Sequence, residues 1–330
     1  MEASAVIFER EPRGARYAKV EVPQLGPDDV LVQSKVVGLC RSDIELLEGH
    51  LDEQLGVPYP IVPGHEWSGE VLEVGSSVSN VAPGKPVVGE CVIAPNHWFG
   101  FTYNGAAAEQ FVVPSQLLHE LPSSLSFEQG ALVEPFTIAY RAIRDNGWLD
   151  AADTVAIVGA GMIGQCALAV ARSMGALTVM VEPSANRRDL AVRMGADIVI
   201  DPTEGGAAEA LQRHTGREGA DLVVEASGNP HGLASTFDLA RFGGRIVNIG
   251  ICAHGQVSAP LGLVQAKDLT VRGTTGSPGV WPQALRFIER NEIDLTPVIT
   301  ATYDFNSAAE ALRAADDAAA NIKVHLHPAG

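Results

Sequence analysis

A glycine-rich stretch in the middle of the chain limits the folds open to it more than any other feature. Residues 154–158 form a short β-branched run that suits a strand buried on both faces. Gly159, Gly161 and Gly164 follow in the spacing G-x-G-x-x-G, and an apolar run comes next. Such glycines allow a tight turn, a close approach of backbone to a pyrophosphate, and close packing of helix on strand. The stretch therefore predicts a dinucleotide site with the phosphates at the helix N-terminus.

A second predicted strand, residues 177–181, ends at Glu182. A carboxylate in this place can accept hydrogen bonds from both ribose hydroxyls of an adenosine, and it repels a 2′-phosphate. The sequence therefore favours NAD. Arg187 and Arg188 follow closely and could reduce the repulsion, which leaves NADP open. The alternative interpretation is a glycine turn in an α/β domain that binds no nucleotide.

The pattern of apolar residues divides the chain. Residues 1 to about 120 contain short apolar or alternating runs separated by proline and glycine, with a predicted helix at 42–47 and a predicted strand at 87–93. This pattern favours a β-rich domain, such as a partly open barrel. A helix is predicted at 127–144, and strands starting near residues 154, 177, 198, 222, 245 and 269 then alternate with helices. This alternation predicts an α/β fold with a doubly wound parallel sheet. Further helices and strands after residue 276 lie outside the alternation.

Composition excludes several classes of protein. The formal net charge of −17 would repel nucleic acid and anionic lipid, so we expect neither as a partner. No apolar run is long enough to span a membrane, and the N-terminal residues lack the pattern of a signal peptide. The four cysteines are far apart and form no C-x-x-C pair, which favours a reducing, cytoplasmic location.

Three segments of the first half combine metal-binding side chains with acids. They centre on Cys40, on His65 with Glu66, and on Glu134. A thiolate, an imidazole and one or two carboxylates suit a catalytic zinc, which keeps one position open for water or substrate. Each residue also has an ordinary structural explanation: a small buried cysteine, a hydrogen-bonded histidine, and a glutamate that favours a helix N-terminus. Spacing alone leaves both interpretations open.

Several motifs, taken together, resemble one known family. They are GLCRSD at residues 38–43, GHE at 64–66 with GEV at 69–71, and GAGMIG at 159–164. In this order they are similar to the zinc-dependent medium-chain alcohol and polyol dehydrogenases, and the resemblance spans nearly the whole chain. The motif LVEP at 132–135 resembles the sorbitol, threonine and glucose dehydrogenase branch, in which a glutamate replaces the second cysteine of the ethanol-oxidising branch.

The resemblance implies a domain plan and a metal site. A GroES-like catalytic domain would occupy residues 1–135 and be completed by 277–330, with a Rossmann domain at 136–276. One catalytic zinc would be held by Cys40, His65 and a glutamate, for which both Glu66 and Glu134 are candidates. Asp43 matches the acid that orients the zinc-bound histidine.

The same resemblance implies a proton route and cofactor contacts. Ser42 matches the hydroxyl that takes the substrate proton. The cofactor contacts would come from the glycine motif with Met162 and Ile163, from Glu182 and Arg187, and from Lys323. Within this set, Ile163 matches an aliphatic residue behind the nicotinamide, and Lys323 matches a basic residue near the pyrophosphate.

The sequence departs from the family pattern in two places. Many members bind a second, structural zinc through four closely spaced cysteines, whereas residues 91–108 are short here and keep only Cys91. We therefore expect no structural zinc. Glu45 stands where many members carry a histidine at the end of a proton chain. It is either the terminal proton acceptor or a solvated residue of the helix surface.

The expected reaction is hydride transfer between a secondary alcohol and NAD(P). The branch glutamate, Glu45 and polar loop residues suggest a small hydroxyl-rich substrate such as a polyol, sugar, cyclitol or amino-cyclitol. Aromatic residues of the shortened loop either line the pocket or seal the domain; they are Trp98, Phe99, Phe101 and Tyr103. The family implies homodimers or homotetramers. The alternatives are a zinc-free reductase of a quinone or enone, a non-catalytic dinucleotide-binding protein, and a Rossmann methyltransferase.

Overall fold

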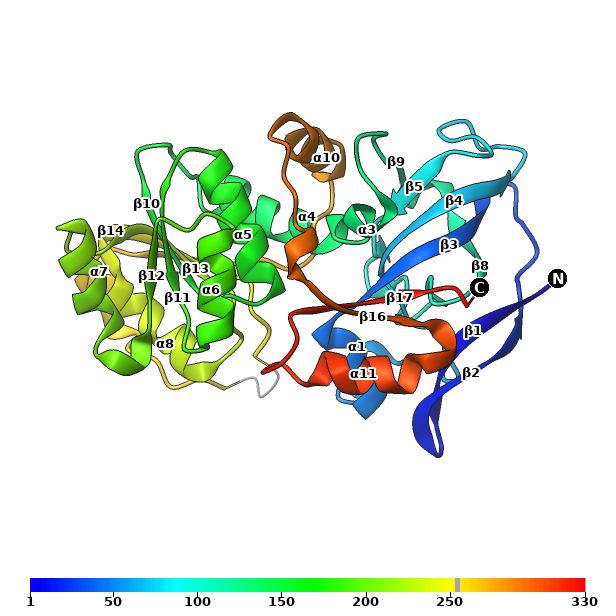
Figure 1. Ribbon diagram of the computed structural model, residues 1–330, viewed down its shortest axis with the longest axis horizontal. Helices are drawn as coiled ribbons and strands as arrows, with labels where there is room; N and C mark the ends of the chain where they lie inside the picture. The colour runs from blue at the N-terminus through cyan, green and yellow to red at the C-terminus, as the bar shows by residue number, and fades with distance from the viewer. Residues whose placement is uncertain (253–255, 330) are drawn as a thin grey trace. The chain divides into compact units, whose positions relative to one another are not determined.

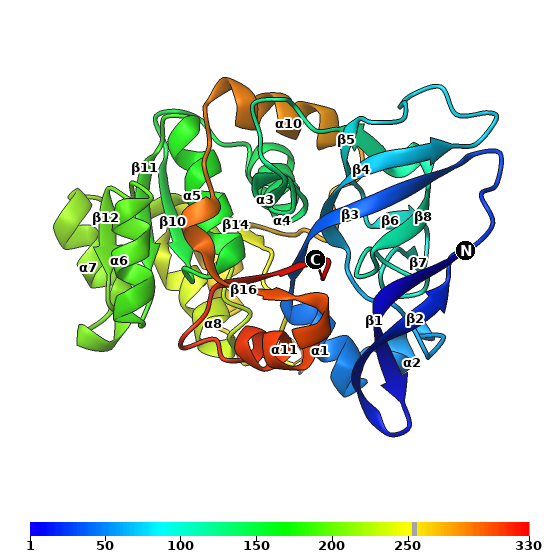
Figure 2. The same cartoon turned by 45° about the vertical axis from the view of Figure 1, so that its right-hand side comes forward.

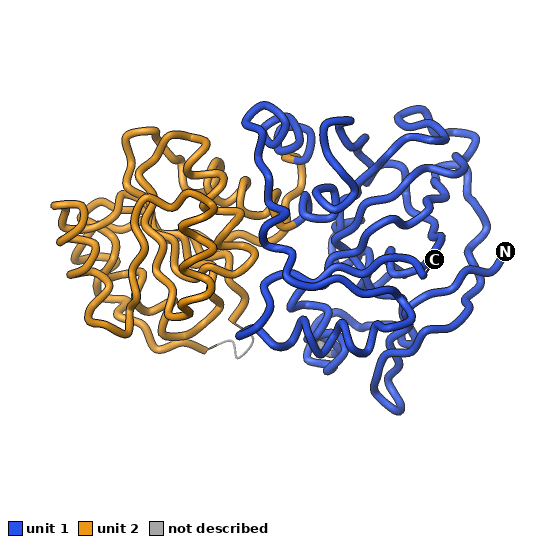
Figure 3. Tube along the Cα trace, in the orientation of Figure 1, with its two compact units in different colours: residues 1–134, 281–330 blue, residues 135–280 orange. Residues whose placement is uncertain are grey.

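The computed structural model describes residues 1–252 and 256–329, and Figure 1 labels its helices and strands. The chain divides into two units, which Figure 3 colours separately. The first unit holds Met1–Glu134 with Trp281–Gly330, and the second holds Pro135–Val280. Residue 330, the end of the predicted tail, lies outside the described residues. Among the described helices, none combines the length and the apolar character that crossing a bilayer requires.

The first unit is built mainly from β-strands. Its largest sheet has the order β16-β17-β3-β4-β5-β9, with β8 paired to β3, and Figure 2 shows β3, β4 and β5 side by side. The strands are β1 (Glu2–Arg10), β2 (Arg13–Glu21), β3 (Asp29–Leu39), β4 (Glu66–Val74), β5 (Pro86–Gly89), β6 (Val92–Ala94), β7 (His97–Trp98), β8 (Gln110–Pro114), β9 (Leu118–Glu120), β16 (Ile299–Asp304) and β17 (Lys323–His327). The helices are α1 (Arg41–Glu48), α2 (Asp52–Leu55), α3 (Phe127–Gly130), α10 (Trp281–Arg290) and α11 (Ala308–Asp316).

The strand β3 is the centre of this sheet. Its residues 30–32 and 36–39 are buried, as expected of a strand with neighbours on both sides. It pairs antiparallel with β4 on one side and with β17 on the other. The last strand of the chain therefore lies beside residues 37–39, immediately before the first candidate zinc ligand.

Two predicted elements are wrong in detail. The strand predicted at 87–93 is divided into β5 and β6, with Glu90 and Cys91 between them. The helix predicted at 127–144 is divided into α3, α4 (Val133–Arg141) and a π-helical turn (Ala142–Asn146). Pro135 explains the break between α3 and α4, because a proline has no N–H to donate and is tolerated only in the first turn of a helix. A new helix must therefore begin close to Pro135, and this places Glu134 in its first turn.

The second unit contains a six-stranded sheet in the order β12-β11-β10-β13-β14-β15, and all its paired strands are parallel. The predicted α/β fold with a doubly wound parallel sheet is confirmed. The strand order reverses between β10 and β13, which is where such sheets bind nucleotides. The strands are β10 (Thr154–Val158), β11 (Leu177–Val181), β12 (Ile198–Ile200), β13 (Ala220–Glu225), β14 (Ala240–Asn248) and β15 (Thr270–Gly273). The further helices are α5 (Met162–Ser173), α6 (Ala185–Arg193), α7 (Ala207–Thr215), α8 (Pro230–Leu239) and α9 (Gly262–Ala266).

Candidate active site

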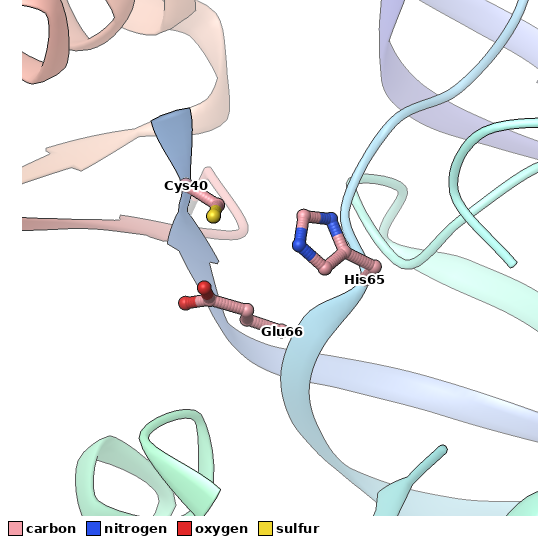
Figure 4. A group of neighbouring side chains, drawn as sticks. All are labelled: Cys40, His65 and Glu66. Atoms are coloured by element: carbon pink, nitrogen blue, oxygen red, sulfur yellow. The ribbon is translucent and has the colours of Figure 1, made fainter. Parts of the chain in front are cut away.

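Three side chains of metal-binding type meet in the first unit. Ligand atoms of Cys40, His65 and Glu66 all lie within 4.8 Å of one another. Figure 4 shows the side chain of Cys40 opposite the ring of His65, and the carboxylate of Glu66 extending toward β3. The register of β3 against β4 brings them together, because Gly38 pairs with Glu66. A Cβ at position 38 would stand 2.7 Å from Oε2 of Glu66, so glycine gives this carboxylate its space.

His65 lies between two groups of helix α1. Its Nδ1 is 3.5 Å from Oδ1 of Asp43, and its Nε2 is 3.4 Å from Oγ of Ser42. The other carboxylate oxygen of Asp43 accepts a hydrogen bond from the N–H of Cys40 at 2.8 Å. Burial lowers the pKa of His65, but the carboxylate of Asp43 outweighs it and holds this pKa well above its ordinary value. The carboxylate therefore orients the imidazole and favours a proton on Nδ1.

These donors fit a zinc ion. A thiolate, an imidazole and a carboxylate are ligands that zinc prefers, and a carboxylate behind the ligating histidine is the usual arrangement. Nδ1 of His65 and Oδ1 of Asp43 are buried, and neither has a hydrogen-bond partner among the described residues. With Nδ1 facing Asp43, the imidazole presents Nε2 on the side of Ser42, which is the nitrogen that would ligate the metal.

Glu66 and Lys323 form a buried ion pair in this site. Nζ of Lys323 lies 2.5 Å from Oε2 of Glu66 and 3.0 Å from the carbonyl oxygen of Leu39. Burial lowers the pKa of Lys323, but Glu66 outweighs this and raises the pKa above its usual value. Because the ammonium has this carboxylate as its partner, the ion pair disfavours the predicted contact of Lys323 with a pyrophosphate, which stays a prediction.

Glu134 lies in the first turn of α4, outside the group of mutually close donors found among the described residues. Burial raises its pKa to about 7, the charge of His65 lowers it, and that of Glu66 raises it. Its charge is thus close enough to interact with both. The structure brings Cys40, His65 and Glu66 together, and Glu134 does not belong to this group among the described residues.

Glu45 is neither a solvated surface residue nor a free carboxylate. It is buried, with Oε1 accepting from Nε of Arg41 at 2.8 Å and Oε2 lying 2.7 Å from Nδ1 of His50. Burial raises the pKa of Glu45, but His50 and Arg41 outweigh it and lower the pKa. Sequence reasoning missed His50, although a histidine just after a helix that ends at glycine can fold back onto the last turn.

The aromatic residues of the short loop have different surroundings. The ring of Phe101 lies 4.7 Å from that of His65, so this residue borders the candidate metal site. Phe99 packs with Trp67 and Phe111 in the core, and Tyr103 is half exposed. Phe99 and Phe101 therefore both belong to the domain core, as expected if the loop seals the domain. That these aromatic residues line a substrate pocket stays a prediction.

The glycine motif of the second unit forms a tight turn between β10 and α5. Gly159 has φ +95°, which only glycine adopts readily. A Cβ at Gly164 would stand 1.9 Å from the carbonyl oxygen of Gly159. Gly161 is the N-cap of α5, so Met162 and Ile163 occupy its first turn. The glycine spacing therefore produces the strand, turn and helix predicted for phosphate binding.

Glu182 is held against this turn. Its Oε2 accepts from the N–H of Ala160 at 2.7 Å, and its Oε1 accepts from the N–H of Ser184 at 2.9 Å. Arg188 donates to the carbonyl oxygen of Glu182 and pairs with Asp201 at 2.8 Å. Arg187 reaches the glycine motif, because a Cβ at Gly161 would stand 3.6 Å from its Nη1. The acid Glu182 and Arg187 thus lie beside the predicted nucleotide site, whereas Arg188 pairs with Asp201.

Two protein-family models match the chain. The model of the alcohol dehydrogenase GroES-like domain covers residues 26–123, and that of zinc-binding dehydrogenases covers residues 163–290. The chain is 32% identical to L-threonine 3-dehydrogenase of Pyrococcus abyssi, over 94% of this chain and 95% of the relative. It is 29% identical to D-arabitol-phosphate dehydrogenase of Enterococcus avium, over 89% of each. A crystal structure of a zinc-binding dehydrogenase from Sinorhizobium meliloti 1021 bound to NADP has a TM-score of 0.90 and 28% identity, covering 99% of this chain and 100% of the other.

Proposed function

Because the chain belongs to the zinc-type medium-chain dehydrogenase family, we propose that it oxidises a secondary alcohol of a small hydroxyl-rich molecule, with one catalytic zinc and NAD. Membership of the family makes the protein an NAD(P)-dependent oxidoreductase of the alcohol dehydrogenase class. The zinc, the substrate class and the preference for NAD are the parts that we propose. The meeting of Cys40, His65 and Glu66 within 4.8 Å is the observation that carries the proposal.

Zinc, when bound, polarises an alcohol oxygen and lowers its pKa. Cys40 and His65 would hold the ion. Glu66 rather than Glu134 is the carboxylate ligand that we propose, because Glu66 belongs to the group with Cys40 and His65 found among the described residues. Oδ1 of Asp43 faces Nδ1 of His65 at 3.5 Å and would orient the imidazole. The ammonium of Lys323 balances the charge of Glu66, so the site has a cation beside its carboxylate when no metal is bound.

Ser42 is the group that we propose to receive the substrate proton. Its hydroxyl lies beside Nε2 of His65 at the start of α1, so it is next to the proposed metal position. Glu45 is a weak candidate for the end of the proton route, because Arg41 and His50 lower its pKa and a carboxylate of low pKa is a poor base. Its role as terminal acceptor stays a prediction.

The nucleotide would bind to the second unit. The N-terminus of α5 suits a pyrophosphate, and Glu182 stands where an acid binds ribose hydroxyls. NAD, when bound, accepts the hydride from the carbinol carbon. A negative carboxylate at this position supports NAD over NADP, although Arg187 lies close by.

The proposed substrate class is supported by the polar site and by the relatives. The two relatives are named for threonine and for an arabitol phosphate, both of which carry secondary alcohols flanked by polar groups. We propose a polyol, sugar, cyclitol or amino-cyclitol. All four cysteines are free in the structure, which supports a reducing, cytoplasmic location.

We also propose a homodimer or homotetramer. Strand β15 ends the sheet of the second unit, and its four residues are exposed. An exposed edge strand offers unpaired backbone groups to another strand. A second copy of the chain is the occupant that we expect, and light scattering of the purified protein measures it.

The decisive experiment combines a substrate panel with a metal assay. We expect NAD reduction with a polyol or cyclitol, about one zinc per chain, and loss of both zinc and turnover in Cys40→Ala and His65→Ala while NADH still binds. Full activity in the metal-free protein would support a zinc-free reductase. Binding of NADH without turnover of any alcohol would support a non-catalytic dinucleotide-binding protein.

A further inference from the structure

A fully buried carboxylate ends the strand β13. Glu225 lies at the carboxyl end of this strand, next to β10, where the strand order of the sheet reverses. Its Oε1 accepts hydrogen bonds from the N–H of Ser227 at 2.8 Å and from the N–H of Gly228 at 3.1 Å. The hydroxyl of Ser227 donates to the same oxygen. One carboxylate oxygen therefore holds the whole turn that follows β13.

This turn lies directly against the glycine motif. A Cβ built on Gly159 would stand 2.8 Å from Cα of Ser227 and 2.9 Å from its backbone nitrogen. The N–H of Ala226 donates to the carbonyl oxygen of Val158 at 2.9 Å. The turn after β13 and the turn after β10 are therefore packed backbone to backbone.

Glu225 also borders the turn after β14. The backbone N–H of Gly250 donates to the carbonyl oxygen of Glu225 at 3.0 Å. A Cβ on Gly250 would stand 2.4 Å from Oε2 of Glu225 and 2.3 Å from the nitrogen of Gly228. Oε2 is buried and has no hydrogen-bond partner within residues 1–252 and 256–329. Both oxygens of this side chain thus lie among the loops at the carboxyl edge of the sheet.

Burying a carboxylate at the end of a strand costs free energy, because the charged group loses its hydration. Burial raises the pKa of Glu225, and the hydrogen bonds from Ser227 and Gly228 act against that rise. Strand termini can be satisfied by neutral groups at lower cost. Glu225 lies at the carboxyl edge of the sheet, which is the edge at which doubly wound folds bind their ligands.

We propose that Glu225 is a positioning residue for the dinucleotide, because it holds the turn 226–228 against Gly159. The inference rests on the proposed NAD(P) binding. The glycine motif and Glu182, which follow β10 and β11, are expected to bind the adenosine half of the dinucleotide. The turn 226–228 follows β13, on the other side of the point where the strand order reverses, and is therefore expected to border the nicotinamide half. Glu225 is therefore expected to affect the binding of the whole dinucleotide more than that of its adenosine half.

The test compares Glu225→Gln with Asp221→Asn. Both residues are buried acids of β13, but Asp221 lies at the amino end, where it accepts from the N–H of Thr154 and pairs with two arginines. NADH affinity is measured by fluorescence titration, and AMP affinity by competition. We expect Glu225→Gln to weaken NADH binding about tenfold and AMP binding less than about twofold. Asp221→Asn should change neither affinity at a temperature at which it is folded.

A second variant, Ser227→Ala, keeps the proposal testable if Glu225→Gln does not fold. Ser227→Ala removes the hydroxyl donor to Glu225 while leaving the buried acid in place, and it should weaken NADH binding in the same direction. Unchanged NADH affinity in Glu225→Gln, or in Ser227→Ala if the first variant does not fold, would overturn the inference. Equal weakening of NADH and AMP, shared by Asp221→Asn, would also overturn it and indicate a general structural effect. Failure of the unmodified protein to bind NADH or NADPH would instead contradict the proposed function.

Discussion

The ammonium of Lys323 lies 2.5 Å from the carboxylate of Glu66, and both side chains are almost completely shielded from solvent. The pair joins residues that are far apart in the sequence, because β17 and β4 flank β3 on its two sides. A buried charge that loses its partner is strongly destabilising, whereas an exposed pair contributes little. This ion pair therefore links the stability of the first unit to the candidate metal site.

Replacing one partner tests this link. Lys323→Met should lower the free energy of unfolding of the metal-free protein by about 3–5 kcal/mol, because Glu66 is left buried and unpaired. Urea unfolding provides the measurement. The matched control is Lys85→Met, whose partner Glu120 lies at 3.2 Å with both side chains about half exposed. It should cost at most about 1 kcal/mol. Equal effects of the two variants would contradict the role assigned to burial.

The identity of the carboxylate ligand can be tested directly. Glu66→Gln should weaken zinc binding more than tenfold relative to Glu134→Gln, since only Glu66 lies with Cys40 and His65 in the group within 4.8 Å. Competition with a chromophoric chelator measures the affinities, and elemental analysis gives the stoichiometry. A larger loss in Glu134→Gln would show that the metal draws Glu134 inward and that Glu66 remains with Lys323.

We expect the cofactor preference to depend on Glu182. The protein should use NAD with a higher kcat/KM than NADP, and Glu182→Ala should lower the ratio of the two values by about 10- to 100-fold, because hydrogen bonds to a charged acceptor are lost. Steady-state kinetics with both cofactors measure the ratio. Glu204→Ala, which removes an exposed acid of the same unit, should leave the ratio unchanged. A preference of the unmodified protein for NADP would overturn this assignment.

Asp221 should make stability depend on pH. Burial raises its pKa, but the N–H of Thr154 and the guanidinium groups of Arg241 and Arg217 outweigh it and lower the pKa. A carboxyl group whose pKa is lowered in the folded state stabilises the protein at pH values above its pKa in the unfolded state, which is about 4. This stabilisation is lost as the pH falls through the pKa of the folded state.

The corresponding variant gives a measurable difference. Asp221→Asn should cost about 1–3 kcal/mol at pH 7, because the arginines and the N–H of Thr154 lose an ionised acceptor. The difference from the unmodified protein should shrink as the pH falls below about 4. Urea midpoints measured across this range check the prediction, and a difference that stays constant with pH would contradict it.

Local pattern was sufficient to predict the second unit. The β-branched run before Gly159, the glycine spacing and the alternation of strands with helices are all properties of neighbouring residues. They predicted the doubly wound sheet, because a parallel strand needs a crossover helix and a tight glycine turn can be recognised from a few positions. The break of the predicted helix at 127–144 could also have been found, since Pro135 tolerates only the first turn of a helix.

The types of the candidate metal donors were evident from the sequence, but which of them lie together was decided by the tertiary structure. Cys40 and His65 approach because β3 pairs with β4 in a register that places Gly38 opposite Glu66. Lys323 arrives through the pairing of β17 with β3. The hydrogen bonds of strand pairs join residues distant in the chain, so no local pattern specifies which donors come together. The residue types indicated the chemistry, and the long-range register of the sheet decided which of these residues share a site.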